Sequence, residues 1–145
     1  MYAISVPQPR ASLLVHGVVR RETRLAQTPY RGVVAIHAGS KFPPAARALC
    51  YQEPYKSLLR RANHEGWSLL PCGFILGTAE LVACTSVQEI AWESGIEPDL
   101  GPYQAGSWVW DFANAVPFRI PVPAPGRMGL FQISDTLLSS AMVLK

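Results

Sequence analysis

The stretch that decides the fold reads Glu22-Thr23-Arg24, then Pro29-Tyr30-Arg31-Gly32, then Val33-Val34-Ala35-Ile36-His37-Ala38-Gly39. Successive side chains of an extended chain point to opposite faces, so Glu22 and Arg24 share a face and can act together. Pro29 presets the backbone of a turn, and Gly32 tolerates dihedral angles that other residues avoid. The apolar run that follows is typical of a strand covered on both faces, and it ends at His37. Because rigid scaffolds present functional groups at strand ends, the polar residues at both ends of this strand indicate a site.

The length and composition of the chain are those of one folded domain. Its 145 residues are enough to bury a core without disulfides. Apolar residues make up 49% of the chain and charged residues 16%, so we expect a folded and not a disordered chain. The three cysteines, Cys50, Cys72 and Cys84, are widely spaced, so we expect reduced thiols and neither a structural metal nor another cofactor. The longest apolar run is too short to span a bilayer and no basic leader precedes it. We therefore expect a soluble, cytoplasmic domain over residues 1–145 without a membrane partner.

Basic residues are concentrated in the half of the chain that holds the proposed site. Residues 1–72 contain ten Lys and Arg against three Asp and Glu, a balance of +7, while residues 73–145 contain three against seven, a balance of −4. A localised basic face is the expected footprint of a phosphate-bearing partner. For Arg47, Arg60 and Arg61 the alternative is a solvated helix surface.

The remaining pattern alternates short strands with helical segments. Strands are expected over residues 1–6, 18–24, 33–36 and 73–85, and later as an aromatic strand over 106–112, a proline-rich edge strand over 118–123 and a last strand over 130–133. Helices are expected over 11–16 before Gly17, over 45–51 and 55–62 on either side of Pro54, as a turn over 87–92, and over 136–142 after a cap at Ser134 or Asp135. The pattern predicts an α+β fold, a small closed β-barrel of about six strands with inserted helices and a C-terminal helix.

Six short motifs occur in one order along the chain. They are Gln8-Pro9-x-Ala11-Ser12-Leu13 with Gly17, Glu22-Thr23-Arg24, Pro29-Tyr30-Arg31-Gly32, Ile36-His37-Ala38-Gly39, Gly77-x-x-Glu80 and Gly126-Arg127-Met128-Gly129-Leu130-Phe131. In this order and spacing the chain resembles the ASCH domain family of the PUA-like β-barrel superfamily, along nearly its whole length. The resemblance implies a barrel with a basic and polar cleft beside it and a link to RNA metabolism. Some members resemble plain RNA-binding modules, and some are reported to cleave RNA.

One small bacterial branch of that family is an amidohydrolase acting on N4-acetylcytidine, in which a Lys and a Thr precede the motif Arg and a Glu lies on a later strand. Aligned on Arg24, this chain has Val19 and Glu22 at the positions of that Lys and Thr. Thr23 does not replace the Thr because it faces the other side of the strand. Only Glu80 carries over, so for an enzyme the resemblance favours RNA cleavage over this amidohydrolase activity.

The candidate binding residues combine cations, polar groups and aromatic rings. Arg24 and Arg31 can hold phosphate through their guanidinium forks, and the alternative for Arg24 is a pair with Glu22 or Glu80. Tyr30 and Trp108 can stack on exposed bases, with core packing as the alternative for Trp108. The full set of candidate binding residues is Gln8, Glu22, Arg24, Tyr30, Arg31 and Trp108.

The candidate catalytic residues are Lys41, His37 and Glu80. Cleavage of RNA through its 2′-hydroxyl needs a base, an acid and charge stabilisation, which such side chains supply without a metal. Each of them has a structural alternative: simple exposure for Lys41, a satisfied structural histidine for His37, and a partner of Arg24 for Glu80. A carboxylate inside an apolar strand, such as Glu80, needs such a partner because burying an unpaired charge is costly. We therefore expect a module that binds RNA or a nucleotide. The alternatives are a metal-independent ribonuclease or a hydrolase of a modified nucleoside, and a protein-interaction domain.

Overall fold

The structure is a computed structural model, and it describes residues 1–64, 66, 68–90 and 105–139. Strands and short helices alternate along the chain, which confirms the predicted α+β class. The elements are β1 (Tyr2–Val6), α1 (Arg10–Val15), β2 (Arg21–Arg24), β3 (Gly32–Ala38), α2 (Pro44–Leu49), α3 (Tyr55–Arg61), β4 (Phe74–Ser86), α4 (Val87–Ile90), β5 (Trp108–Pro123), β6 (Phe131–Gln132) and α5 (Asp135–Leu138).

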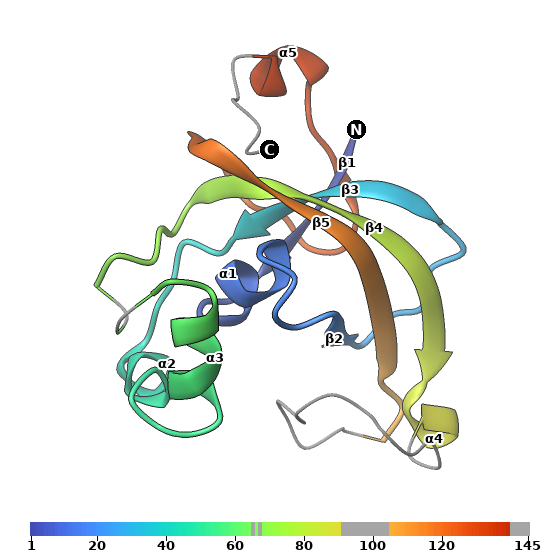
Figure 1. Cartoon of the computed structure of the whole chain (residues 1–145). Helices are drawn as coiled ribbons and strands as arrows, with labels where there is room; N and C mark the ends of the chain where they lie inside the picture. The colour runs from blue at the N-terminus through green and yellow to red at the C-terminus, as the bar shows by residue number, and fades with distance from the viewer. Residues whose placement is uncertain (65, 67, 91–104, 140–145) are drawn as a thin grey trace.

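The strands form one mixed sheet in the order β2-β5-β4-β3-β1-β6. β1 and β3 are parallel, and all other neighbouring pairs are antiparallel. The two long strands, β4 and β5, curve together around α1 (Figure 1). In the described residues β2 and β6 are the two ends of the sheet, so the pairing gives a curved six-stranded sheet and does not close it into the predicted barrel.

Apolar residues are buried on both faces of this sheet. Val34 and Ile36 belong to a cluster shared with α1, whereas Ala35 between them belongs to a cluster on the other face that is reached by α5. Successive side chains of one strand point to opposite faces, and here both faces are covered. The predicted coverage of both faces is confirmed for residues 34–36, whereas Val33, at the start of the predicted strand, is 46% exposed.

The helix α1 packs against the sheet where β4 has a glycine. A Cβ atom at Gly77 would lie 2.2 Å from the carbonyl oxygen of Val116 and 2.5 Å from Cγ2 of Val15 in α1. The C-cap of α1 is His16, and Gly17, which the sequence predicts as the C-cap, is the next residue, with a φ of +72°. Leu13, also in α1, packs into a separate cluster with α3. The helix is therefore held between the sheet and the α2–α3 pair.

The strand β5 differs from the prediction of two separate strands over 106–112 and 118–123. One continuous strand covers Trp108–Pro123. Only its first four residues, Trp108 to Asp111, pair with β2, so its proline-rich half has β4 as its one described neighbour. A free strand edge tolerates proline, which has no N–H to donate. The predicted edge position of this half is therefore consistent with the described pairing.

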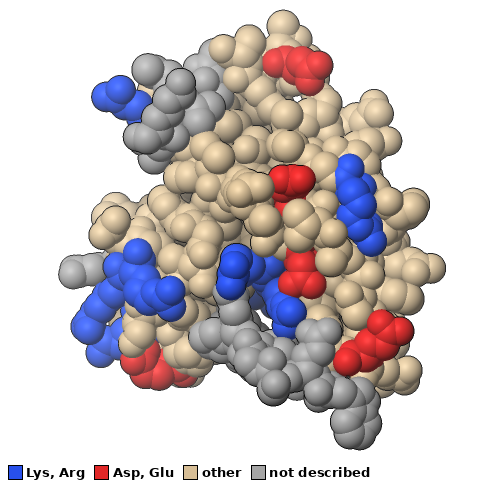
Figure 2. All heavy atoms as spheres, turned by 45° about the vertical axis from the view of Figure 1, so that its right-hand side comes forward, with Lys and Arg blue, Asp and Glu red and all other residues tan. Residues whose placement is uncertain are grey.

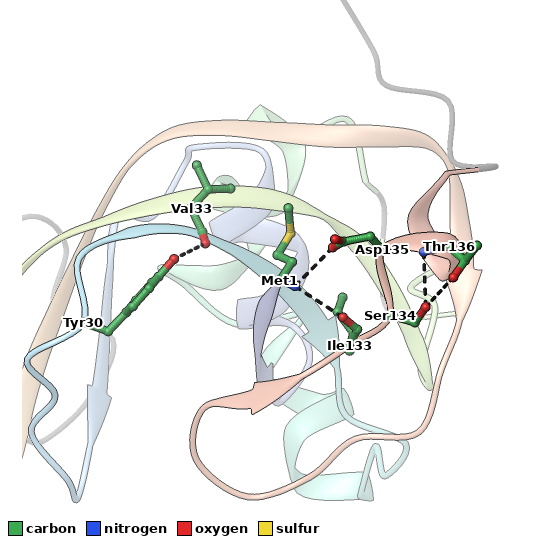
Figure 3. Close-up of polar contacts among 7 residues, drawn as sticks. All are labelled: Met1, Tyr30, Val33, Ile133, Ser134, Asp135 and Thr136. Carbon is green, nitrogen blue, oxygen red and sulfur yellow. Dashed lines mark hydrogen bonds and ion pairs between the residues drawn. The ribbon is translucent and has the colours of Figure 1, made fainter.

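Several element ends also differ from the prediction. β2 begins at Arg21 rather than at Val18, and α4 ends at Ile90, with the rest of the predicted turn outside the described residues. Ser134 caps α5 by accepting a hydrogen bond from the backbone N–H of Thr136, as predicted, and the Met1 amine contacts Asp135 and the Ile133 carbonyl (Figure 3). The predicted part of that helix beyond Ser139 also lies outside the described residues.

The cysteines form no disulfide, and the helices are short. Cys50 is buried, whereas Cys72 and Cys84 are half-buried, and all three are free thiols. Of the described helices, none has the length and apolar character needed to cross a membrane.

Candidate functional site

Two pockets of about 550 Å³ each meet beside β1 and β2, and we refer to them together as the Arg24 cleft. Both pockets are lined by Ser5, Arg24 and Met128. The first pocket is lined further by the charged side chains of Arg10 and Glu22 and by apolar ones that include Leu25, Trp110 and Leu130. The second pocket is lined further by His37, Ser40, Lys41, Gly126 and Arg127. The predicted site therefore lies in a cleft, and residues 126–128, which are distant in the sequence, form part of its lining.

Arg24 is held at the junction of the two pockets. Its Nη1 donates a hydrogen bond to the carbonyl oxygen of Ser5 at 3.1 Å, and its guanidinium carbon lies 5.3 Å from the ring centroid of Trp110. Trp110 itself is anchored by a hydrogen bond from Nε1 to the carbonyl oxygen of Ala26 at 2.9 Å. Burial lowers the pKa of Arg24, and the neighbouring Glu22 carboxylate opposes that shift. These contacts fix the guanidinium in place beside both pockets.

Glu22 is the buried carboxylate of the cleft. Its side chain lies within 3.2 Å of Nη2 of Arg10, and only 4% of the residue is exposed. Burial raises the pKa of Glu22, and the positive charges of Arg10 and Arg24 partly offset that effect. Glu22 and Arg24 are therefore electrostatically coupled, as their shared face on the strand predicts.

The second pocket brings together two of the three predicted catalytic residues. Lys41 is exposed and His37 is almost fully buried, yet both line this pocket. The ring of His37 contacts Oγ of Ser5 through Nδ1 at 3.0 Å and the carbonyl oxygen of Ala124 through Nε2 at 2.7 Å. The geometry therefore fixes the orientation of the imidazole from both sides.

The third predicted catalytic residue, Glu80, is held elsewhere. Its Oε2 accepts a hydrogen bond from Nδ2 of Asn114 at 2.9 Å on the neighbouring strand, and Glu80 does not line the Arg24 cleft. Between these two described residues, the predicted ion pair of Glu80 with Arg24 is absent. The uncharged amide of Asn114 provides the hydrogen bond to the half-buried Glu80 carboxylate instead. The pairing of β4 with β5 sets Glu80 opposite Ala113, the residue before Asn114.

Gln8, a predicted binding residue, is buried and engaged within the protein. Its Nε2 donates to Oγ of Ser12 at 2.9 Å and to the carbonyl oxygen of Pro71 at 2.8 Å, while its Oε1 accepts from the backbone N–H of Ser12. These three bonds fasten the start of α1 to the segment before β4. Gln8 does not line the cleft.

Tyr30 and Arg31 are tied into their own turn. The Tyr30 hydroxyl donates to the carbonyl oxygen of Val33 at 2.8 Å (Figure 3), and its ring packs edge-on against Tyr2. Nη1 of the exposed Arg31 donates to the carbonyl oxygens of Thr28 and Tyr30. Trp108 is half-buried and packs against the main core, in line with its structural alternative. None of these three predicted binding residues lines the Arg24 cleft.

Sequence reasoning assigned no role to Ser5, Arg10 and Arg127, which line the cleft. Arg10 occupies the position written x in the first motif, and Arg127 lies in the last motif. Membership of these motifs could therefore have identified both arginines as candidate binding residues. Ser5 is found only through the parallel register that sets it beside His37. Among the described residues, no three His, Cys, Asp or Glu side chains gather as a metal-ligand group.

Comparisons with known proteins give relatives in sequence and in fold. No protein-family model matches the chain. The chain is 29% identical to activating signal cointegrator 1 from Mus musculus and from Homo sapiens over 140 residues, which is 97% of this chain and 23% of each relative. It therefore spans about a quarter of the length of these curated relatives.

The fold is similar to crystal structures of ASCH from Zymomonas mobilis. The structure of that protein and that of a serine-to-alanine variant superpose with TM-scores of 0.60 and 0.61 at 16% identity, over 97% of this chain and 94% and 95% of theirs. At this identity the likeness concerns the fold. The chain therefore shares the fold of the Zymomonas mobilis ASCH protein and is similar in sequence to activating signal cointegrator 1 along almost its whole length.

Proposed function

We propose that this ASCH-type domain binds RNA or a nucleotide in the Arg24 cleft, with phosphate groups held by its cations. The observation that carries the proposal is the charge of the lining. Cationic side chains from four separate segments line the cleft, namely Arg10, Arg24, Lys41 and Arg127. Among the lining residues that the structure describes, Glu22 is the one carboxylate, and it is already paired with Arg10. Such a surplus of cations favours a ligand with several negative charges.

The apolar part of the cleft suits the rest of such a ligand. Leu25 and Met128 line the first pocket and are among the most exposed large apolar side chains of the described residues, with Met128 96% exposed. A base or a ribose would cover these apolar surfaces while its phosphates reach the cations. The resemblance to a family that includes RNA-binding modules supports the same ligand class.

Basic side chains elsewhere extend the surface available to a longer strand. Figure 2 shows Lys and Arg side chains gathered over α2 and α3, with further ones toward the centre of the view. α3 ends with Arg60 and Arg61, and both are exposed. These residues remain compatible with a solvated helix surface, so the proposal rests on the cleft and not on this second group.

The test is a filter-binding titration with a short single-stranded RNA at two salt concentrations. We expect Arg24→Ala to weaken binding about tenfold or more and to reduce the salt dependence by about one phosphate contact. Arg119→Ala is the matched control, because Arg119 is an exposed arginine of β5 that does not line the cleft. An Arg24→Ala variant that melts like the parent and binds RNA as tightly would refute the proposal.

Metal-independent cleavage of RNA is the second candidate function, because Lys41 and His37 line one pocket. A base and a cation at one site are the groups that such cleavage uses. The RNA recovered from the titration, kept in a chelator throughout, distinguishes the two functions on a denaturing gel. Full-length RNA supports a binding module, whereas fragments that disappear with Lys41→Ala support a ribonuclease.

A further inference from the structure

Ser5 and His37 form a hydrogen-bonded pair that phosphate binding does not require. They are directly opposite each other in the parallel register of β1 and β3, near the carboxyl ends of both strands. The Oγ of Ser5 lies 3.0 Å from Nδ1 of His37. Ser5 also lines both pockets, so this residue lies where the two halves of the cleft meet.

The other side of the imidazole determines the role of each nitrogen. Nε2 of His37 lies 2.7 Å from the carbonyl oxygen of Ala124, and a carbonyl oxygen can only accept a hydrogen bond. Nε2 therefore carries a proton, and in the neutral ring Nδ1 is the acceptor for the hydroxyl proton of Ser5. A serine hydroxyl that donates to a histidine whose other nitrogen is held by an oriented acceptor has the arrangement of an activated nucleophile.

The surroundings keep this pair close together. His37 is only 1% exposed, and the pairing register of β3 with β4 shifts between Ile36 and His37. The loop after β5 closes over the pair at Gly126, where a Cβ atom would lie 2.7 Å from Cε1 of His37 and 3.0 Å from Oγ of Ser5. A larger residue at this position would have to displace one of the two side chains.

We propose that Ser5 is a nucleophile activated by His37 and that the cleft hydrolyses a carboxylic ester of a phosphate-bearing alcohol. The two halves of the cleft argue for this class of substrate. The half with Arg24, Lys41 and Arg127 attracts the phosphate of the alcohol, while the first pocket offers apolar surface to the acyl group. Ser5 lies between the two, where the ester bond of such a substrate would lie. Arg24, at the same junction, is placed to stabilise the negative charge that develops on the ester oxygen.

The proposed reaction has two balanced steps. In the first, Oγ of Ser5 forms a bond to the ester carbon, its proton passes to Nδ1 of His37, and the alcohol leaves with that proton. In the second, water attacks the acyl-serine while His37 takes a proton from it, and the acid is released as Ser5 regains its hydrogen. No oxidant, reductant or co-reactant other than water is needed.

The test is covalent labelling of the full chain with diisopropyl fluorophosphate, followed by intact mass measurement and peptide mapping. The probe needs no RNA, because Oγ bonds to phosphorus, fluoride leaves and the proton passes to His37. We expect one adduct on Ser5, its loss in Ser5→Ala, and labelling at least about 100-fold slower in His37→Gln. Ser40→Ala is the matched control, because Ser40 lines the same pocket and no hydrogen bond to a histidine is described for it.

Each outcome decides the proposal. Failure to label the folded protein, an adduct on Ser40 instead of Ser5, or an unchanged labelling rate in a folded His37→Gln variant would overturn it. If His37→Gln does not fold, two results still test the proposal. They are the position of the adduct in the parent protein and the loss of the adduct in Ser5→Ala. The inference uses the cleft of the proposed function but not its ligand. Labelling without RNA retention would uphold the nucleophile and refute RNA binding, and RNA retention without labelling would do the reverse.

Discussion

At the scale of single residues, Glu22 is a carboxyl group that the fold removes from water, with 4% of the residue exposed. Burial raises its pKa, although Arg10 and Arg24 lower it in part. A carboxyl group whose pKa is higher in the folded state binds its proton more tightly there than in the unfolded chain. Its contribution to stability is therefore present at acid pH and is lost as the pH rises from the unfolded pKa through the folded one.

The substitution Glu22→Gln tests this coupling, because it removes the charge and keeps the shape. We expect the melting temperature of the parent to fall relative to that of Glu22→Gln as the pH is raised from below the ordinary glutamate pKa, about 4.3, to neutrality. Thermal melts of both proteins across that range measure the difference. Glu89→Gln makes the same change at an exposed carboxylate and serves as control. A parent that gains stability over Glu22→Gln with rising pH would contradict the raised pKa.

At the scale of elements, the contact of α1 with β4 depends on the absence of a side chain at Gly77. A Cβ atom there would meet the backbone of β5 at 2.2 Å as well as Val15 of α1, and the backbone cannot move aside as a flexible side chain can. We expect Gly77→Ala to lower the free energy of unfolding by about 1–3 kcal/mol or more. Urea unfolding curves measure this change.

Gly39→Ala is the matched glycine substitution for that experiment. Its added Cβ would lie 3.7 Å from the nearest side-chain atom, Oγ of Ser5, which is ordinary van der Waals contact. We expect its unfolding midpoint to stay close to that of the parent. Equal midpoints for Gly77→Ala and Gly39→Ala would show that the helix can shift away from the sheet at little cost.

Elements with strong local signals could be predicted from the sequence, and those set by distant pairing could not. Gly17 after α1, Pro54 between α2 and α3, and Ser134 before α5 act on their own backbone, so each marks a boundary that the structure has. The prediction of two strands over 106–112 and 118–123 is wrong, because the single strand β5 also contains the residues between them, together with its prolines. They are accommodated since β2 pairs only with Trp108 to Asp111.

At the scale of the whole molecule, the candidate site could be predicted only in part. Arg24, His37 and Lys41 lie close together in the sequence and do share one cleft. Arg127 joins them from a loop after β5, and Ser5 joins them through the register of β1 with β3, so both depend on the complete sheet. The sequence predicts Tyr30 as a binding residue because it lies in a turn. In the structure its hydroxyl instead donates a hydrogen bond to the backbone carbonyl of Val33 in the same turn. Local pattern cannot separate a residue that binds a ligand from one that holds a turn.

The closure of the sheet is the remaining property of the whole molecule, and hydrogen exchange can test it. In the described order β2 is an end of the sheet with β5 as its neighbour, whereas β3 lies between β4 and β1. In an antiparallel pair, alternate N–H groups of an end strand point away from the partner. We expect such amides of Arg21–Arg24 to exchange at least about tenfold faster than those of Val34–Ile36, as measured by NMR on the intact chain. Uniform protection of all four β2 amides at the level of β3 would mean that β2 has a second strand neighbour, as the predicted closed barrel requires.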